Sequence, residues 1–332
     1  MRIAFFEIKE WEKDYLQEKM KKHDLKFIKE PLNIENVDKI QKYDVISVFI
    51  YSKITKEVLD LCPNLKLIAT RSTGFDHIDV IDCNKREITV SNVPYYGENT
   101  IAEHTFGLIL SLTRNIHKSY LRTLRNDFSI KGLKGFDLKG KTIGVVGAGH
   151  IGLHVIRVAK AFGMKVLAYD IKQDSFLAEV LGFEYVPFKD ILEKSDIITL
   201  HVPYNKSTHH LINKENVRMI KKGAILINTA RGGVVDTEAI IEAIDEKILS
   251  GVGLDVLEGE ELLLEETRLV YDPENLENLA NLVKDQILLS KDNVVFTPHI
   301  AFYSQEALER ILDTTTENIL AFISGGSQNI VN

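Results

Sequence analysis

One stretch of the sequence decides the fold: residues 142–152 read TIGVVGAGHIG. The apolar run 142–146 is typical of a buried strand in a parallel sheet. It is followed by the pattern G-x-G-x-x-G and by an amphipathic helix expected over 151–162. Glycines at this spacing let the backbone approach a pyrophosphate at a helix N-terminus. The residues that carry this dinucleotide-binding prediction are Gly147, Gly149, His150, Ile151 and Gly152.

The place of this motif in the chain predicts the domain organisation. A single hydrophobic core stops growing near ~250–300 residues, and this chain has 332. The glycine motif begins almost midway, so a segment of domain size precedes it. We therefore expect a nucleotide-binding domain over 99–299, inserted in a second domain made of 1–98 and 300–332.

Strands and helices alternate on both sides of the motif, which indicates an α/β fold with parallel sheets. Before the motif, helices are expected at 11–22 and 55–61, and one long helix at 98–124; after it, a last amphipathic helix follows Ser304. The fold class is therefore two Rossmann-like or flavodoxin-like parallel-sheet domains. Strands are expected at 3–6, 25–28, 45–50, 67–70, 88–90, 165–169, 196–200, 224–228, 251–255 and 294–296.

Composition excludes some classes of function. The net charge of −7 argues against nucleic acid as the main partner, and an anionic substrate would need a local cation. Two cysteines without a C-x-x-C motif indicate reduced thiols in a cytoplasmic protein. The N-terminal residues resemble a strand and not a signal peptide, and no apolar run approaches the ~18 residues of a membrane span. We expect no metal, because His209-His210 resembles a polar turn.

In open parallel sheets, ligands bind beyond the carboxyl ends of the strands. Every expected strand of the second half ends on a polar or glycine-rich element, and their convergence predicts a site at one edge of the sheet. These elements are the glycine loop, Asp170 after Tyr169, His201-Val202-Pro203, Thr229-Ala230-Arg231-Gly232, Asp255 with Glu258 and Glu260, and Thr297-Pro298-His299.

Three of these residues have a specific expected chemistry. Asp170 lies 18 positions after Gly152, where a carboxylate accepts hydrogen bonds from ribose hydroxyls and repels a 2′-phosphate. This favours NAD over NADP, although Lys172 nearby leaves room for NADP. Arg231 could hold a substrate carboxylate by two parallel hydrogen bonds. His299 is a candidate acid/base, because histidine titrates near neutral pH.

A carboxylate beside His299 would stabilise the protonated imidazole and fix its tautomer. Glu258, Glu260 and Glu261 all compete for this role, and the residues alone leave the choice open.

Several motifs taken together resemble one family, the D-isomer-specific 2-hydroxyacid dehydrogenases, and within it the D-lactate dehydrogenase branch. The similarity runs from Val45 to about Phe322 and includes the glycine loop with Asp170. The other motifs are RSTGFDHID at 71–79, AEHT at 102–105, LHVP at 200–203, INTARG at 227–232, GLDV at 253–256 and TPHIA at 297–301.

The resemblance implies a catalytic set of Arg231, Glu260 and His299, and so selects Glu260 as the partner of His299. It implies that the backbone N–H groups of Thr73 and Gly74 bind the substrate carboxylate and that Tyr96 and Phe302 line the substrate pocket. Substrate contacts are therefore expected from Thr73, Gly74, Tyr96, Arg231 and Phe302. The motifs and the resemblance together place NAD against Gly147, Gly149, His150, Ile151, Gly152, Tyr169, Asp170, His201, Val202, Pro203, Thr208, Thr229, Ala230, Arg231, Asp255 and His299.

The activity implied is reduction of a small 2-keto acid, foremost pyruvate, by NADH. Other D-2-hydroxy acids, such as 2-hydroxyisocaproate or glycerate, remain alternatives, as does a non-catalytic NAD-sensing protein. The resemblance also implies a homodimer formed through the nucleotide-binding domain, with neither nucleic acid nor membrane as a partner.

Overall fold

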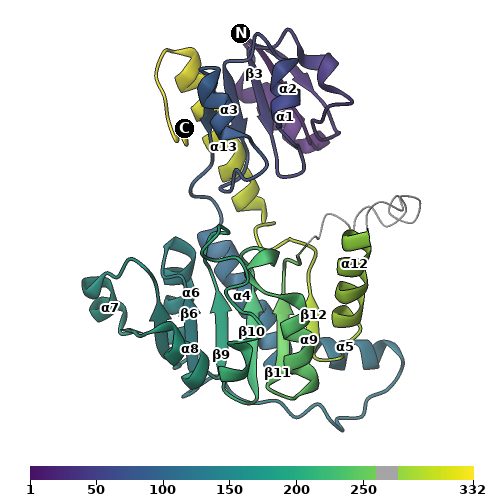
Figure 1. Ribbon diagram of the computed structural model, residues 1–332, viewed down its shortest axis with the longest axis vertical. Helices are drawn as coiled ribbons and strands as arrows, with labels where there is room; N and C mark the ends of the chain where they lie inside the picture. The colour runs from purple at the N-terminus through teal and green to yellow at the C-terminus, as the bar shows by residue number, and fades with distance from the viewer. Residues whose placement is uncertain (259–275) are drawn as a thin grey trace. The chain divides into compact units, whose positions relative to one another are not determined.

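The computed structural model describes residues 1–258 and 276–332, with the backbone alone at 276–282 (Figure 1). The chain divides into two compact units. We call Met1–Tyr96 with Ser304–Asn332 the terminal unit, and Gly97–Tyr303 the central unit. The central unit is thus inserted into the terminal one; it runs from Gly97 to Tyr303, beside the 99–299 expected from the sequence.

The terminal unit is built on a five-stranded sheet in the order β2-β1-β3-β4-β5, with every pairing parallel. Its strands are β1 (Arg2–Phe5), β2 (Asp24–Phe27), β3 (Val45–Val48), β4 (Leu67–Thr70) and β5 (Thr89–Ser91). Its helices are α1 (Glu10–Lys19), the 3₁₀ helix η1 (Val37–Ile40), α2 (Lys56–Asp60), α3 (Val80–Lys85) and α13 (Gln305–Ile323).

Successive residues of a strand point to opposite faces of the sheet, and both faces of this sheet are covered. Ile3 and Phe5 of β1 pack in a core with residues of α1 and α13. Ala4, in the same strand, and the following Phe6 pack in a second core with residues of η1, α2 and α3. Strands buried on both faces explain why the sequence shows continuous apolar runs and not alternation.

The central unit contains a seven-stranded parallel sheet in the order β12-β11-β10-β9-β6-β7-β8. Its strands are β6 (Thr142–Val146), β7 (Lys165–Tyr169), β8 (Glu184–Tyr185), β9 (Ile197–Leu200), β10 (Ala224–Asn228), β11 (Leu249–Leu254) and β12 (Val294–Phe296). Its helices are α4 (Glu98–Thr113), α5 (Ile116–Leu124), α6 (His150–Ala161), α7 (Ser175–Leu181), α8 (Phe188–Lys194), α9 (Thr237–Asp245) and α12 (Leu276–Leu289), with 3₁₀ turns η2 (Val217–Met219) and η3 (Gly232–Val234).

This sheet also has a core on each face. Residues of α4, α6 and α7 pack on one face, and residues of α8, α9 and η2 pack on the other (Figure 1). The chain passes from β6 to β7 on one side and then crosses to β9 on the other. The strand order therefore reverses beside β6, and a crevice at that reversal is where open α/β sheets bind ligands. The predicted fold class, two parallel-sheet α/β units, is confirmed.

The prediction of one long helix over residues 98–124 is wrong. The helix breaks at Arg114 and Asn115, and Asn115 adopts a left-handed conformation with φ of 52°. The carbonyl of Thr113 accepts a hydrogen bond from Phe136 N at 3.0 Å and is therefore not used to continue the helix. Asparagine is one of the few residues that tolerates this conformation, so tertiary contacts and one permissive residue together end α4.

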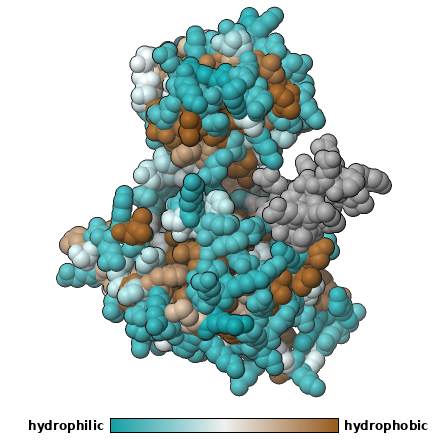
Figure 2. Space-filling model, viewed as in Figure 1, coloured by the Kyte–Doolittle hydropathy of each residue, from teal (hydrophilic) through white to brown (hydrophobic). Residues whose placement is uncertain are grey.

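Neither cysteine forms a disulfide, since Cys62 and Cys83 are both free and buried. Burial raises the pKa of each thiol to about 11, so both stay protonated near neutral pH. Among the described helices, none is both long enough and apolar enough to cross a membrane. Figure 2 shows mostly hydrophilic side chains on the visible face, with separate hydrophobic patches.

Candidate active site

The glycine loop connects β6 to α6 in a shape that only glycines allow. Gly147 has a φ of 94°, and its N–H donates to Tyr169 O at 2.8 Å. A Cβ on Gly152 would collide with the carbonyl oxygen of Gly147. A Cβ on Gly149 would meet no described atom within 4 Å beyond its chain neighbours, so this side of the loop is open. The loop therefore presents a close-fitting backbone on one side and free space at the N-terminus of α6, as a pyrophosphate requires.

Asp170 lies directly after β7 and contacts this loop. Its Oδ2 accepts a hydrogen bond from Ala148 N at 2.7 Å, and its Oδ1 accepts one from Lys172 N at 2.8 Å. A carboxylate has about four acceptor positions, so two remain for the hydroxyls of a ribose. The geometry fits the role expected from the sequence.

The segment after β9 starts with His201. Its Nε2 lies 2.9 Å from Thr199 Oγ1, and burial lowers the pKa of the imidazole to about 3. His201 is therefore neutral at physiological pH and does not act as a general acid there. Further on, the Thr208 hydroxyl donates to Pro203 O at 2.6 Å, which closes the loop that begins at Val202 and Pro203.

Arg231 lies in the loop between β10 and η3. Asn228, the last residue of β10, accepts a hydrogen bond from Ala230 N at 3.0 Å and donates one to Arg231 O at 2.9 Å. Thr229 is held by its hydroxyl, 3.1 Å from that of Thr105 in α4. The loop is thus fixed from both sides, and the guanidinium of half-buried Arg231 donates from Nη1 to Ala230 O at 2.8 Å.

Asp255 organises the turn that carries His299. This buried carboxylate, 1% exposed, accepts from Thr297 Oγ1 at 2.5 Å, Ile300 N at 3.0 Å and Ala301 N at 2.8 Å. Its backbone carbonyl accepts from His299 N at 2.9 Å. His299 itself has a φ of 52°. A strained residue in a turn whose other members bond to one buried carboxylate is typical of a functional position.

The predicted catalytic partner, Glu260, lies outside the described residues, as does the competing Glu261. The third candidate, Glu258, is described, and its Oε1 lies 2.9 Å from His210 Nε2. The structure therefore pairs Glu258 with His210.

Two predicted substrate residues, Thr73 and Gly74, lie in the terminal unit, in the loop after β4. The Thr73 hydroxyl donates to Val93 O at 2.8 Å, and the Thr73 carbonyl accepts from Asn92 Nδ2 at 2.8 Å. Ser72 Oγ donates to Gly74 O at 2.6 Å. These bonds fix the backbone of the loop, and with it the direction of its N–H groups.

The two predicted aromatic residues lie in different units. In the terminal unit, the carbonyl of Tyr96 accepts from Arg310 Nε at 2.7 Å. In the central unit, the Phe302 ring lies edge-on to the His299 imidazole, with centroids 6.2 Å apart.

Three residues whose contacts organise these loops received no individual role in the sequence analysis. His104 in α4 lies 2.9 Å from Thr297 Oγ1 and 3.4 Å from Asp255 Oδ1. Asn228 supports the Arg231 loop. The buried guanidinium of Arg71 donates to Phe6 O at 2.6 Å and to Ser47 Oγ at 3.1 Å, joining the ends of β4, β1 and β3 beneath the Thr73 loop. Each lies in one of the quoted motifs, which could have marked it as a candidate. The sequence does not reveal the contacts of His104 and Arg71, because their partners are distant in the chain.

Comparison with known proteins identifies the family. The family model described as D-isomer specific 2-hydroxyacid dehydrogenase, NAD binding domain, matches residues 106–301. A structure of D-lactate dehydrogenase from Aquifex aeolicus, complexed with NAD and lactic acid, is 40% identical, with a TM-score of 0.89 over 98% of this chain and 96% of that one.

Two curated relatives extend the comparison. D-lactate dehydrogenase of Escherichia coli is 34% identical over 326 residues, 96% of each chain. Glyoxylate reductase of Thermofilum pendens is 40% identical over 300 residues, 89% of this chain and 83% of the relative.

The chain belongs to the D-isomer-specific 2-hydroxyacid dehydrogenase family. It is an NAD-dependent enzyme of that family, and the predicted cofactor, NAD(H), is confirmed. The open glycine loop and the Asp170 carboxylate provide the physical fit for this cofactor.

Proposed function

We propose that this protein is a D-lactate dehydrogenase, which reduces pyruvate with NADH and oxidises D-lactate with NAD. The observation that carries this choice is the similarity, over nearly the whole chain, to the Aquifex aeolicus enzyme complexed with NAD and lactic acid. Arg231 and His299, which the chemistry needs, lie on fixed turns at the carboxyl edge of one sheet.

The proposed cofactor site uses the loops at that edge. The glycine loop and the N-terminus of α6 bind the pyrophosphate, and Asp170 accepts from the adenosine ribose. The loops containing Val202, Pro203 and Thr208, and Thr229 and Ala230, contact the rest of the dinucleotide, together with Tyr169, His201 and Asp255. NADH, when bound, supplies the hydride that reaches the substrate carbonyl carbon.

The proposed substrate site neutralises one charge and delivers one proton. Arg231 binds the pyruvate carboxylate by charge-assisted hydrogen bonds, assisted by the backbone N–H groups of Thr73 and Gly74. His299 donates its proton to the carbonyl oxygen, and Tyr96 and Phe302 are further proposed substrate contacts. In the reverse direction, His299 removes the proton of the hydroxyl group. Positioned acid catalysis of this kind contributes about 10²–10⁴-fold.

Glu260 is the proposed partner of His299, because an anion next to the imidazole stabilises its protonated form. The test is Glu260→Gln with the matched control Glu258→Gln. We expect the pH above which pyruvate reduction fails to move lower in Glu260→Gln and to stay unchanged in the control. An unchanged profile in Glu260→Gln would remove this residue from the scheme.

The substrate is tested by steady-state NADH oxidation with pyruvate, 2-ketobutyrate, 2-ketoisocaproate, phenylpyruvate, hydroxypyruvate, oxaloacetate and glyoxylate. We expect the highest kcat/KM with pyruvate and D-lactate as the product. Preference for glyoxylate or a bulkier acid would keep the mechanism and change the substrate. No turnover with any of these acids would favour a non-catalytic NAD-binding protein.

We further propose that the protein is a homodimer formed through the central unit. Helix α5 buries none of its side chains within the described chain, and it exposes Ile116, Tyr120, Leu121 and Leu124. Phe128 and Ile130, 76% and 86% exposed, follow. Exposed apolar surface of this extent is typical of an interface. The two free thiols fit a reducing cytoplasmic compartment.

The dimer is tested by light scattering after size-exclusion chromatography. A charge on α5 would have to be desolvated in an apolar interface, so we expect Leu124→Asp to give a monomer. Ile81→Asp, at a site 72% exposed in the terminal unit, should leave the dimer intact. A monomeric wild type would contradict the proposal.

A further inference from the structure

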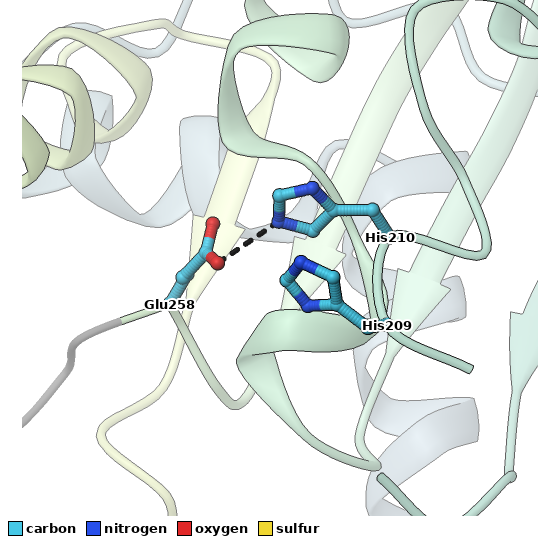
Figure 3. Close-up of side chains that lie close together, drawn as sticks. All are labelled: His209, His210 and Glu258. Atoms are coloured by element: carbon cyan, nitrogen blue, oxygen red, sulfur yellow. Dashed lines mark hydrogen bonds and ion pairs between the residues drawn. The ribbon is translucent and has the colours of Figure 1, made fainter. Parts of the chain in front are cut away.

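A second group of ligand-bearing side chains lies in the central unit, outside the catalytic set. It consists of His209, His210 and Glu258, here called the His–His–Glu cluster (Figure 3). One ligand atom from each residue lies within 4.8 Å of the other two. In Figure 3, both imidazoles extend toward the carboxylate.

The backbone brings the two histidines together. In an extended chain, neighbouring side chains point to opposite sides. His210 instead has a φ of 47°, its N–H donates to Gly233 O at 2.9 Å, and its carbonyl accepts from Asn213 Nδ2 at 3.1 Å. As a result the two rings stack, with centroids 3.9 Å apart and planes 23° apart. The turn thus places two adjacent imidazoles on the same side of the chain.

Glu258 reaches the histidines from the segment after β11. The preceding carbonyl, of Leu257, packs so closely on Gly232 that a Cβ there would collide with it. On the other side, the Tyr204 hydroxyl lies 3.2 Å from His209 Nδ1. A metal-binding histidine donates its other ring N–H to an outer acceptor, which orients the ring and fixes its tautomer. With Nδ1–H of His209 donating to the Tyr204 oxygen, Nε2 would be left for a metal.

The chemistry of the cluster selects one class of ion. Two imidazoles and a carboxylate suit Zn²⁺ and neighbouring transition metals, whereas Mg²⁺ and Ca²⁺ prefer oxygen ligands alone. In a tetrahedral Zn²⁺ site with bonds of ~2.1 Å, ligand atoms lie ~3.4 Å apart. His210 and Glu258 are 2.9 Å apart and the third atom lies within 4.8 Å, so small side-chain rotations suffice. His209 is exposed and the other two are half-buried, which leaves a path for the ion and a fourth position for water.

We propose that His209, His210 and Glu258 form a binding site for a divalent transition metal of the Zn²⁺ class. A simple hydrogen-bonded pair would need only His210 and Glu258. The stacked His209, held by Tyr204, supplies the third ligand that distinguishes a metal site from such a pair.

The test is isothermal titration calorimetry of the full chain, first treated with EDTA, with ZnCl₂ as the probe. We expect one Zn²⁺ per chain, and affinity reduced about tenfold or more in His209→Ala and in Glu258→Gln. His23→Ala, which removes a histidine of the terminal unit, is the matched control and should bind Zn²⁺ as the wild type does. Circular dichroism checks that every variant is folded.

Co²⁺ provides a second, spectroscopic readout, because tetrahedral coordination gives a visible band far more intense than the weak absorption of hexaaqua Co²⁺. The band should appear in the wild type and in His23→Ala and be lost in His209→Ala. Absence of Zn²⁺ binding, or equal affinity in His209→Ala and the wild type, would overturn the proposal.

A metal here would join the loop after β9 to the segment after β11. That consequence rests on the proposed function, since Thr208 and Glu260 are neighbours of these ligands in the sequence. We expect saturating Zn²⁺ to change the KM for NADH in the wild type but not in His209→Ala. Because calorimetry needs no turnover, a protein that binds Zn²⁺ without acting on any keto acid would refute the function and leave the metal site intact.

Discussion

Replacing Asp255 with asparagine tests whether this carboxylate positions His299. The substitution keeps the size of the side chain and removes one of its two acceptor oxygens. With the amide oxygen in place of Oδ1, the bonds to Thr297 and Ile300 persist. The new NH₂ group then faces the N–H of Ala301, which loses its acceptor. The opposite orientation of the amide would remove the other two bonds instead.

The magnitude follows from the lost bond. A hydrogen bond to a charged group contributes about 1.5–3 kcal/mol, and a buried N–H left without a partner costs about 1–3 kcal/mol. Since these two contributions overlap, we expect the free energy of unfolding to fall by about 3 kcal/mol. In a unit of this size, such a loss lowers Tm by about 6–12 °C. The loosened turn should also reduce kcat about 10²-fold, because a displacement of about 1 Å in a catalytic group has this effect.

Asp196→Asn is the matched control. Asp196 also binds a backbone N–H and a cation, with Thr142 N at 2.8 Å and Lys221 Nζ at 2.8 Å, but it precedes β9 at the opposite edge of the sheet. We expect it to lower Tm and leave kcat within about twofold, since it loses similar bonds without touching the His299 turn. Thermal unfolding and NADH oxidation with pyruvate measure both quantities. A wild-type kcat in Asp255→Asn, or an equal loss of kcat in the control, would refute the reasoning.

Substitutions at three further positions test other parts of the structure. Asp170→Ala should raise the KM for NADH about tenfold or more and favour NADPH, because the carboxylate no longer repels a 2′-phosphate; unchanged discrimination would contradict this role. The unfolded chain protonates His201 near pH 6.5, whereas the folded chain does so only at about pH 3. The free energy of unfolding should therefore fall as pH decreases through that range. Measured by denaturant unfolding at several pH values, it should depend less steeply on pH in His201→Gln than in the wild type. Asn115→Val should lower the free energy of unfolding by about 1–2 kcal/mol, because valine tolerates the positive φ poorly. Asn115→Gly should leave this free energy nearly unchanged. Equal effects of the two substitutions would exclude backbone strain as the cause.

The positions of several candidate residues at strand ends could be predicted, because buried strands and the polar residues that follow them are both visible in short stretches of sequence. Asp170 and Arg231 each follow an apolar run that could only be a buried strand, and parallel strands bring their carboxyl ends to one edge. The glycine loop needs no distant residue to be recognised, since its spacing reflects the local requirements of a tight turn and a helix N-terminus.

Other parts could not be predicted because they depend on pairs distant in sequence. Glu258 was a candidate partner for His299, yet it bonds to His210, 48 positions away. His104 received no individual role from the sequence, yet it contacts Thr297 and Asp255, which are distant from it in the chain. No periodicity encodes such contacts, because they arise when separate elements pack.

Two parallel-sheet units, with a dinucleotide loop in the second, follow from the amino-acid sequence, since continuous apolar runs and glycine spacing are local properties. The end of α4, in contrast, depends on tertiary contacts, because the Thr113 carbonyl accepts its hydrogen bond from Phe136 N. The tertiary structure also decides that one buried carboxylate, Asp255, shapes the His299 turn, and that two adjacent histidines meet a glutamate. The physical reason is the same in each case: a polar group bonds to whichever partner the packing of distant segments brings within reach.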